Sequence, residues 1–161
     1  MRLFIAIHLS DEMKKALVAC MHDLKKQGVE GNYVPAQNLH MTLAFLGEYD
    51  DPAKVKDVIR KVPLPEFRLS LSEKGNFGNI LWAGVKGNQK LKTYVKDLRA
   101  ALAEEGIPFD REKFVPHITL IRKVSAKQPY QVHLPKADMT VKKASLMRSE
   151  QKNGKMVYKE L

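Results

Sequence analysis

The sequence contains one four-residue motif twice, as HMTL at residues 40–43 and as HITL at residues 117–120. Both copies lie in apolar segments that are typical of buried strands. Because residues i and i+2 of a strand point to the same side, each copy presents one imidazole beside one hydroxyl. Two such pairs facing each other would surround an anion with an acid, a base and two hydroxyl donors, a set that suits phosphoryl transfer.

The histidines of the two copies, His40 and His117, could hold opposite protonation states near neutral pH. One would take a proton from water as it attacks phosphorus, and the other would give a proton to the departing oxygen. Thr42 and Thr119 would donate hydrogen bonds to the non-bridging phosphate oxygens. A strained five-membered cyclic phosphodiester is a natural substrate for such a site. The residues alone leave open which histidine is the acid.

Other chemistries find less support in the sequence. Neither histidine is flanked by the close-spaced His, Cys or carboxylate ligands of zinc sites, so we expect no metal. The phosphate loop G-x-x-x-x-G-K-[ST], the esterase motif G-x-S-x-G and the dinucleotide motif G-x-G-x-x-G are all absent. We therefore expect a reaction that requires no cofactor.

When the first half of the chain is shifted by the 77 residues that separate the motifs, the segments that precede the two motifs also align. The expected strand 3–7 corresponds to 80–84, and the expected helix 11–27 to 88–104, with Ser10 and Asn88 as N-caps. Gly28 and Gly106 are the expected stop signals of the two helices. This order predicts an α+β fold built by internal duplication, with two similar lobes, each an antiparallel sheet backed by helices. Residues 1–161 would form a single domain.

The rest of the chain predicts several further elements. Asp51 and Pro52 should open a helix over 53–62, and a strand should follow over 67–71. We expect a turn-rich link over 73–76 and a loop over 123–131. Closing strands are expected over 140–149 and 156–161, joined through the hairpin signal Asn153-Gly154.

Composition and charge narrow the class of partner. The net charge is +10, and the single cysteine excludes an internal disulfide and fits a reducing compartment. Residues 1–80 carry 11 basic and 10 acidic side chains, whereas residues 81–161 carry 17 and 8, so the excess lies in the second half. No apolar run approaches the roughly 20 residues that span a bilayer. We expect a cytoplasmic protein with a polyanionic partner, and no membrane association.

Cationic and aromatic residues near the motifs could complete a phosphate site. Arg111, Lys113, Arg122 and Lys123 cluster around the second motif. Arg122 lies five residues beyond His117, so strict alternation would turn it to the opposite face unless the strand ends or bulges first. Among the aromatic residues that could stack on a base, Phe4 is the strongest candidate, because it shares a strand face with Ala6 and His8.

These residues resemble the two-histidine (2H) phosphoesterase superfamily, whose hallmark is a duplicated His-x-Thr/Ser motif. More narrowly, the chain is similar to the RNA 2′,3′-cyclic phosphodiesterases of the bacterial and archaeal 2′-5′ RNA ligase group. The resemblance extends over nearly the whole chain. It is carried by RLFIA at 2–6, NLHMTL at 38–43, FLG at 45–47, LWAGV at 81–85, FVPHITL at 114–120, Arg122 and Tyr158.

The resemblance implies a bilobal α+β fold in which two antiparallel sheets face a central cleft and the helices lie outside. It implies metal-independent hydrolysis of RNA 2′,3′-cyclic phosphate ends to 2′-phosphates, and reversible joining of 2′-5′ linkages. By matching position, His40 and His117 are the catalytic pair, Thr42 and Thr119 bind phosphate, and Arg122 contacts it. Because O3′ is then the leaving oxygen, we assign His40 as proton donor and His117 as proton acceptor.

The expected partner is RNA or an oligonucleotide with a cyclic phosphate end, bound by a monomer that needs no other protein. The chain differs from the family pattern in two respects. The first half is nearly neutral, so we expect any RNA-binding surface to lie on the second lobe. The loop 123–131 is short, which leaves little room for an RNA-specific insertion. Two alternatives stay open. The same site could act on a small cyclic nucleotide or an ADP-ribose cyclic phosphate, or the protein could be a non-catalytic RNA-binding module with vestigial histidines.

Overall fold

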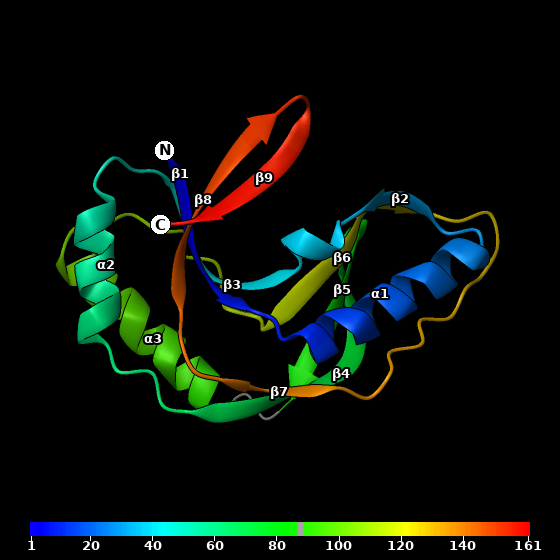
Figure 1. The fold of residues 1–161 in the computed structure, drawn as a ribbon, viewed down its shortest axis with the longest axis horizontal. Helices are drawn as coiled ribbons and strands as arrows, with labels where there is room; N and C mark the ends of the chain where they lie inside the picture. Colours follow the sequence, from blue (N-terminus) through cyan, green and yellow to red (C-terminus); the bar gives the residue numbers. More distant parts are fainter. Residues whose placement is uncertain (87–88) are drawn as a thin grey trace.

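Two antiparallel sheets form the framework of the molecule, with the helices on their outer sides (Figure 1). The computed structural model describes residues 1–86 and 89–161. The helices are α1 (Asp11–Lys26), the short 3-10 helix η1 (Ala36–Asn38), α2 (Pro52–Lys61) and α3 (Gln89–Glu104). The strands are β1 (Arg2–His8), β2 (Glu30–Tyr33), β3 (His40–Glu48), β4 (Phe67–Phe77), β5 (Ile80–Lys86), β6 (His117–Ser125), β7 (Asp138–Val141), β8 (Ser145–Lys152) and β9 (Lys155–Glu160).

The expected fold class is confirmed, but the two halves of the chain exchange strands. One sheet has the order β3-β1-β8-β9 and the other has the order β2-β6-β5-β4-β7. Each sheet therefore contains strands from both halves, and neither lobe is made by one half alone. The buried core is correspondingly continuous from Leu3 in β1 to Leu146 in β8.

The first helix forms where its capping and apolar spacing predict it. Ser10 is the N-cap and accepts a hydrogen bond from the backbone N–H of Met13 at 3.2 Å. The side chains of Met13, Leu17 and Leu24 are fully buried, and they follow helical spacing. This face packs toward β7, so α1 covers the sheet formed mainly by the second half.

The two long helices end in the same way. At α1 the N–H of Gly28 bonds the carbonyl of Lys25, and the N–H of Val29 bonds that of Leu24. At α3, Gly106 and Ile107 make the corresponding bonds to Ala103 and Leu102. Both glycines have φ values, +87° and +69°, in the left-handed region of a Schellman C-cap. The predicted stop signals are confirmed; the expected N-cap Asn88 lies outside the described residues.

The strands show where local sequence signals were misleading. The expected link 73–76 is part of β4, and the turn falls at Gly78, which has φ +58°. Gly75 serves close packing instead, because a Cβ there would lie 2.2 Å from the ring of Trp82. The expected strand 140–149 is two strands in different sheets, β7 and β8. The expected loop 123–131 begins only after Ser125, and β2 was not predicted.

The closing hairpin is confirmed at Asn153-Gly154. Both residues have positive φ, +53° and +76°, as a two-residue hairpin turn requires. The β8–β9 hairpin extends beyond the rest of its sheet, and β9 forms the sheet edge (Figure 1). Among residues 1–86 and 89–161, no strand pairs with the outer edge of β9.

Candidate active site

An open cleft, with a volume of about 1470 Å³, runs between the two sheets. His40 and Thr42 line it from β3, and His117, Thr119 and Arg122 line it from β6. The two motif strands lie against each other where the sheets meet. The structure thus brings together both histidines and both threonines, which lie 77 residues apart in the chain.

Each catalytic candidate is oriented by a carbonyl two residues earlier. The Nδ1 of His40 lies 2.7 Å from the carbonyl oxygen of Asn38, and the Nδ1 of His117 lies 2.7 Å from that of Val115. A carbonyl oxygen can only accept, so Nδ1 carries the proton in both rings. In the neutral form each Nε2 is therefore left with a lone pair, and it is available for proton transfer.

Matching bulges in the two motif strands decide which later side chains reach the cleft. On β3, Ala6 pairs with Thr42 and Ile5 with Ala44, so Leu43 is an extra residue. Both Leu43 and Ala44 consequently face the core, with exposed fractions of 0% and 1%. The alternation then resumes with the opposite phase, and Phe45 lines the cleft.

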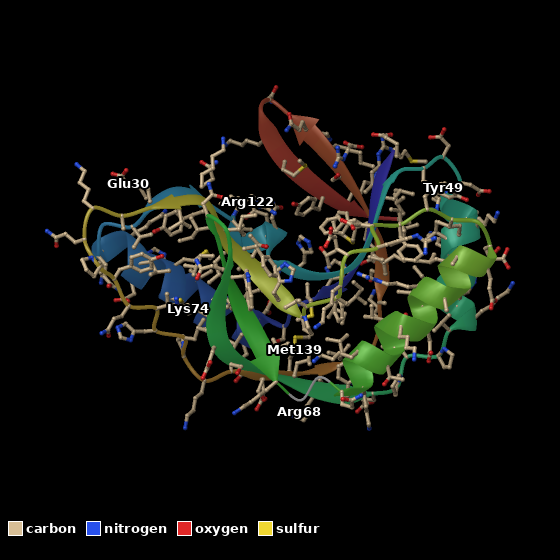
Figure 2. All side chains as sticks on the ribbon, turned by 180° about the vertical axis from the view of Figure 1, so that it is seen from behind. Glu30, Tyr49, Arg68, Lys74, Arg122 and Met139 are labelled. Atoms are coloured by element: carbon tan, nitrogen blue, oxygen red, sulfur yellow. The ribbon has the colours of Figure 1, made fainter. Side chains whose placement is uncertain are left out.

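The same irregularity occurs on β6 at the position expected from the repeat. Trp82 pairs with Thr119 and Leu81 with Ile121, so Leu120 is the extra residue. Because of this bulge, the side chain of Arg122 reaches the cleft and lines it. Arg122 lies on β6 beside β2 (Figure 2). Of the expected cationic cluster, Arg111, Lys113 and Lys123 do not line the cleft. Lys113 and Lys123 are exposed to solvent, whereas the guanidinium of Arg111 lies over the ring of Phe109, 4.7 Å from its centroid.

Aromatic rings pack against both histidines. The ring of His40 lies 5.1 Å from those of Phe4 and Tyr158. The ring of His117 lies 5.0 Å from that of Phe77 and 5.7 Å from that of Trp82. Each imidazole thus has two aromatic neighbours, which restrict its orientation.

Phe4 lines the cleft, but its side chain is only 4% exposed. Its nearest aromatic neighbours include Phe45, whose ring is 6.2 Å away and whose exposed fraction is 53%. The geometry therefore suits Phe4 to supporting His40, and the open aromatic surface beside it belongs to Phe45. Base stacking by Phe4 stays a prediction.

The two motifs differ in the hydrogen bond between the histidine ring and the threonine hydroxyl. The Nε2 of His40 lies 2.8 Å from the Oγ1 of Thr42. Within the described residues, the Nε2 of His117 has no hydrogen-bond partner. Neutral His40 accepts this bond from Thr42, whereas protonated His40 donates it.

The electrostatics of the cleft weaken proton binding by His40. Burial lowers the pKa of His40 most, while the hydrogen bond to the Asn38 carbonyl raises it. The charges of Arg122, His8 and His117 lower it further. The effect of Arg122, His8 and His117 on the pKa of His40 reflects their proximity to this ring, and a bound anionic phosphate would oppose it.

The sequence assigned no role in the site to several residues that line or support it. Tyr158, which entered only through the family resemblance, comes from β9, outside the part of the chain that repeats, and Phe77 follows a segment expected to be a turn. Asn38 is 9% exposed, and its Nδ2 donates to the carbonyl of Met156 on β9 at 3.0 Å. Its side chain thus ties the strand that follows it to the hairpin.

In residues 1–86 and 89–161, no three His, Cys, Asp or Glu side chains are grouped as metal ligands would be. None of the helices in the same part of the chain has the length and hydropathy needed to cross a bilayer.

Comparison with known proteins identifies the family of this chain. The sequence model of the 2′-5′ RNA ligase superfamily matches residues 9–153, which is most of the chain. The protein belongs to this superfamily. The resemblance inferred from the two His-x-Thr motifs is thereby confirmed.

Individual members of the superfamily agree with this assignment. The RNA 2′,3′-cyclic phosphodiesterase of Thermotoga maritima is 36% identical over 132 residues, covering 76% of this chain and 70% of that protein. The enzyme of the same name from Escherichia coli is 32% identical, covering 77% and 73%. The crystal structure of E. coli LigT complexed with 3′-AMP superposes with a TM-score of 0.86 at 29% identity, covering 99% of this chain and 94% of that one.

Proposed function

We propose that this 2′-5′ RNA ligase superfamily member hydrolyses RNA 2′,3′-cyclic phosphate ends to 2′-phosphates without a metal. The observation that carries the proposal is the pair of imidazoles in one cleft, each with Nδ1 anchored on a carbonyl. Relatives that are 36% and 32% identical to this chain bear the name of this activity. An enzymatic role is therefore favoured over a non-catalytic RNA-binding module.

In the proposed reaction, His117 is the base and His40 is the acid. The lone pair on the Nε2 of His117 takes a proton from water as the water oxygen bonds to phosphorus. The P–O3′ bond breaks, and O3′ receives the proton held on the Nε2 of His40. The product carries a 2′-phosphomonoester and a free 3′-hydroxyl, and proton exchange with solvent restores both rings.

The neighbouring groups fit this division of roles. The free Nε2 of His117 suits a base that must accept a water molecule. Before the reaction, protonated His40 donates its Nε2 proton to the oxygen of Thr42, which leaves the Thr42 hydrogen free for a phosphate oxygen; the same Nε2 proton then passes to O3′ as the P–O3′ bond breaks. Thr119 and Arg122 line the cleft on the other side, where they can stabilise the remaining non-bridging oxygens.

Turnover of a 2′,3′-cyclic nucleotide in excess EDTA tests the proposal. We expect hydrolysis to persist, with a 2′-phosphate as the only product in phosphorus NMR. His40→Ala and His117→Ala should each abolish turnover while leaving the far-ultraviolet circular dichroism unchanged. A requirement for added Zn²⁺ or Mn²⁺ would rule out the two-imidazole mechanism, and a 3′-phosphate product would rule out O3′ as leaving group.

The biological setting is proposed on the same grounds. We expect a cytoplasmic monomer whose substrate is an RNA end, with reversible 2′-5′ joining as a further reaction of the superfamily. A preference for a mononucleotide or an ADP-ribose cyclic phosphate over oligonucleotides would instead favour the small-substrate alternative.

A further inference from the structure

We propose that the cleft continues as a binding groove for the nucleotides on the 5′ side of the cyclic phosphate, with Lys25 and Lys155 as its phosphate contacts. The inference rests on the proposed function and adds residues that lie outside both His-x-Thr motifs. The occupant is single-stranded RNA of more than one nucleotide. The groove would make the protein prefer oligonucleotides to mononucleotides.

The size of the cleft is the first observation. Its volume of about 1470 Å³ exceeds the roughly 300–1,000 Å³ of pockets that hold a drug-sized molecule. The lining continues from the histidines along β2 on one side and along the β8–β9 hairpin on the other. A single nucleotide at the catalytic pair would leave much of this space unfilled.

The β8–β9 hairpin has the features of a nucleic-acid surface. Five consecutive residues, from Gly154 to Tyr158, line the cleft along the unpaired edge of β9. Met156 and Val157 are 39% and 37% exposed, so this edge strand offers apolar surface to a partner. Exposed apolar side chains can pack against bases, and free backbone N–H groups can bind phosphate.

The opposite wall carries a second cation. Lys25 extends over the ring of Tyr33, with its Nζ 4.7 Å from the ring centroid. Neither Lys25 nor Lys155 forms an ion pair with any residue that the structure describes. Both ammonium groups are exposed and therefore available to phosphates.

The charge of the lining fits a polyanion. Its basic side chains are Arg2, Lys25, Arg122 and Lys155, and its acidic side chains are Glu30 and Asp110. Two of these cations come from the first half of the chain, although that half is nearly neutral overall. The proposed track therefore joins both halves, in contrast to the expectation of a track on the second lobe alone.

Arg122 connects the reactive centre to this groove. Asn32 on β2 pairs directly with Arg122, and a Cβ on Gly31 would lie 2.8 Å from the Arg122 carbonyl oxygen. This close approach holds β2 beside the residue that would bind the cyclic phosphate. The RNA would pass from Arg122 between β2 and β9. An edge strand can also pair with a peptide, but the unpaired lysines on both walls favour RNA.

Binding of product oligonucleotides tests the groove without requiring turnover. We would measure dissociation constants by fluorescence anisotropy for labelled RNAs of one, two, four and six nucleotides that end in a 2′-phosphate. Wild-type affinity should rise by at least about tenfold from one to four nucleotides and should fall with salt. In the double variant K25Q/K155Q, the slope of log Kd against log salt should decrease by about 1.4 for two lost single-strand contacts.

The control is the double variant K26Q/K159Q. It removes the same charge from the same two elements, α1 and β9, at residues that do not line the cleft. Its affinity and its salt slope should stay close to those of the wild type. Equal losses in both double variants would mean that overall charge, and not a groove, attracts the RNA, and would overturn the inference.

The binding experiment can fail or succeed independently of the proposed hydrolytic function. If wild-type affinity does not depend on RNA length, the groove is absent, even where cyclic mononucleotides are hydrolysed. If affinity depends on length and on the two cleft lysines, the groove stands, even where hydrolysis fails. Parallel kcat/KM values should show the same change in the ratio of oligonucleotide to mononucleotide substrate.

Discussion

At the scale of single residues, the protonation of His40 determines what Thr42 can offer a substrate. The 2.8 Å contact between His40 Nε2 and Thr42 Oγ1 holds one hydrogen. When His40 is neutral, its Nε2 accepts the hydroxyl hydrogen of Thr42. When His40 is protonated, its Nε2–H donates to the Thr42 oxygen, and the Thr42 hydrogen is free to bind another acceptor. When His40 is in its acid form, the hydroxyl of Thr42 is therefore free to donate a hydrogen bond to a phosphate oxygen.

Loss of either threonine hydroxyl should reduce catalysis strongly. We expect Thr42→Val and Thr119→Val each to cost about 2–4 kcal/mol in transition-state stabilisation, by analogy with loss of an oxyanion donor. Steady-state kcat/KM on a 2′,3′-cyclic nucleotide measures this loss. The same change at Thr93, which is exposed on α3, should have no effect. Near wild-type rates in both motif variants would show that the hydroxyls do not bind the phosphate.

The charge of Arg122 should be visible in the titration of His40. Burial and then the cations around it lower the pKa of His40 from 6.5. Arg122→Met removes one of these cations, so the pKa of His40 should rise, whereas Arg122→Lys should leave it nearly unchanged. Proton NMR of the His40 ring measures the pKa directly. If His40 is the acid, the limb of the bell-shaped kcat/KM profile that reports His40 should move to higher pH in the methionine variant. A downward shift would contradict the geometry.

At the scale of elements, the sequence predicted what local patterns encode. Helix ends at Gly28 and Gly106 and the turn at Asn153-Gly154 follow from the backbone conformations that these residues favour. The convergence of His40 and His117 followed from the duplicated motif. The bulges at Leu43 and Leu120 could not be predicted, because an apolar extra residue is compatible with both a regular and an irregular strand.

Other errors also have physical causes. The segment 73–76 contains glycine and polar residues that usually mark a turn, but Gly75 is needed where Trp82 packs across the backbone. Strand β2 is short and polar, and it forms only because β6 offers an edge. Its contribution to the cleft, including Asn32 and Tyr33, was therefore invisible in the sequence.

The link between η1 and β9 gives a prediction at this scale. Asn38→Ala removes the hydrogen bond to the Met156 carbonyl and should lower the free energy of unfolding by about 1–3 kcal/mol. It should also lower kcat, because the carbonyl of the same residue orients His40. Urea denaturation and turnover measure the two effects. Asn79→Ala, in the exposed β4–β5 turn, is the control. Wild-type stability in the Asn38 variant would show that the hairpin is held by other contacts.

At the scale of the whole molecule, the exchange of strands makes the two halves interdependent. Strands β8 and β9 of the second half complete the sheet of β1 and β3, while β2 and β4 of the first half complete the other sheet. Each half alone would leave sheet edges unpaired and apolar helix faces uncovered. The cleft between the sheets, and with it the pairing of the two histidines, exists only when both halves are folded.

This architecture predicts a single cooperative unfolding transition. Trp82 is the only tryptophan and lies in β5, so its fluorescence reports on one sheet, whereas far-ultraviolet circular dichroism reports on all elements. The two signals should give the same urea midpoint and the same slope, as expected for one domain over residues 1–161. Separate fragments 1–77 and 78–161 should be unfolded when alone, because each lacks strands of both sheets. Two distinct midpoints, or a folded fragment, would mean that the halves are independent lobes and that strand exchange contributes little to the stability of the active site.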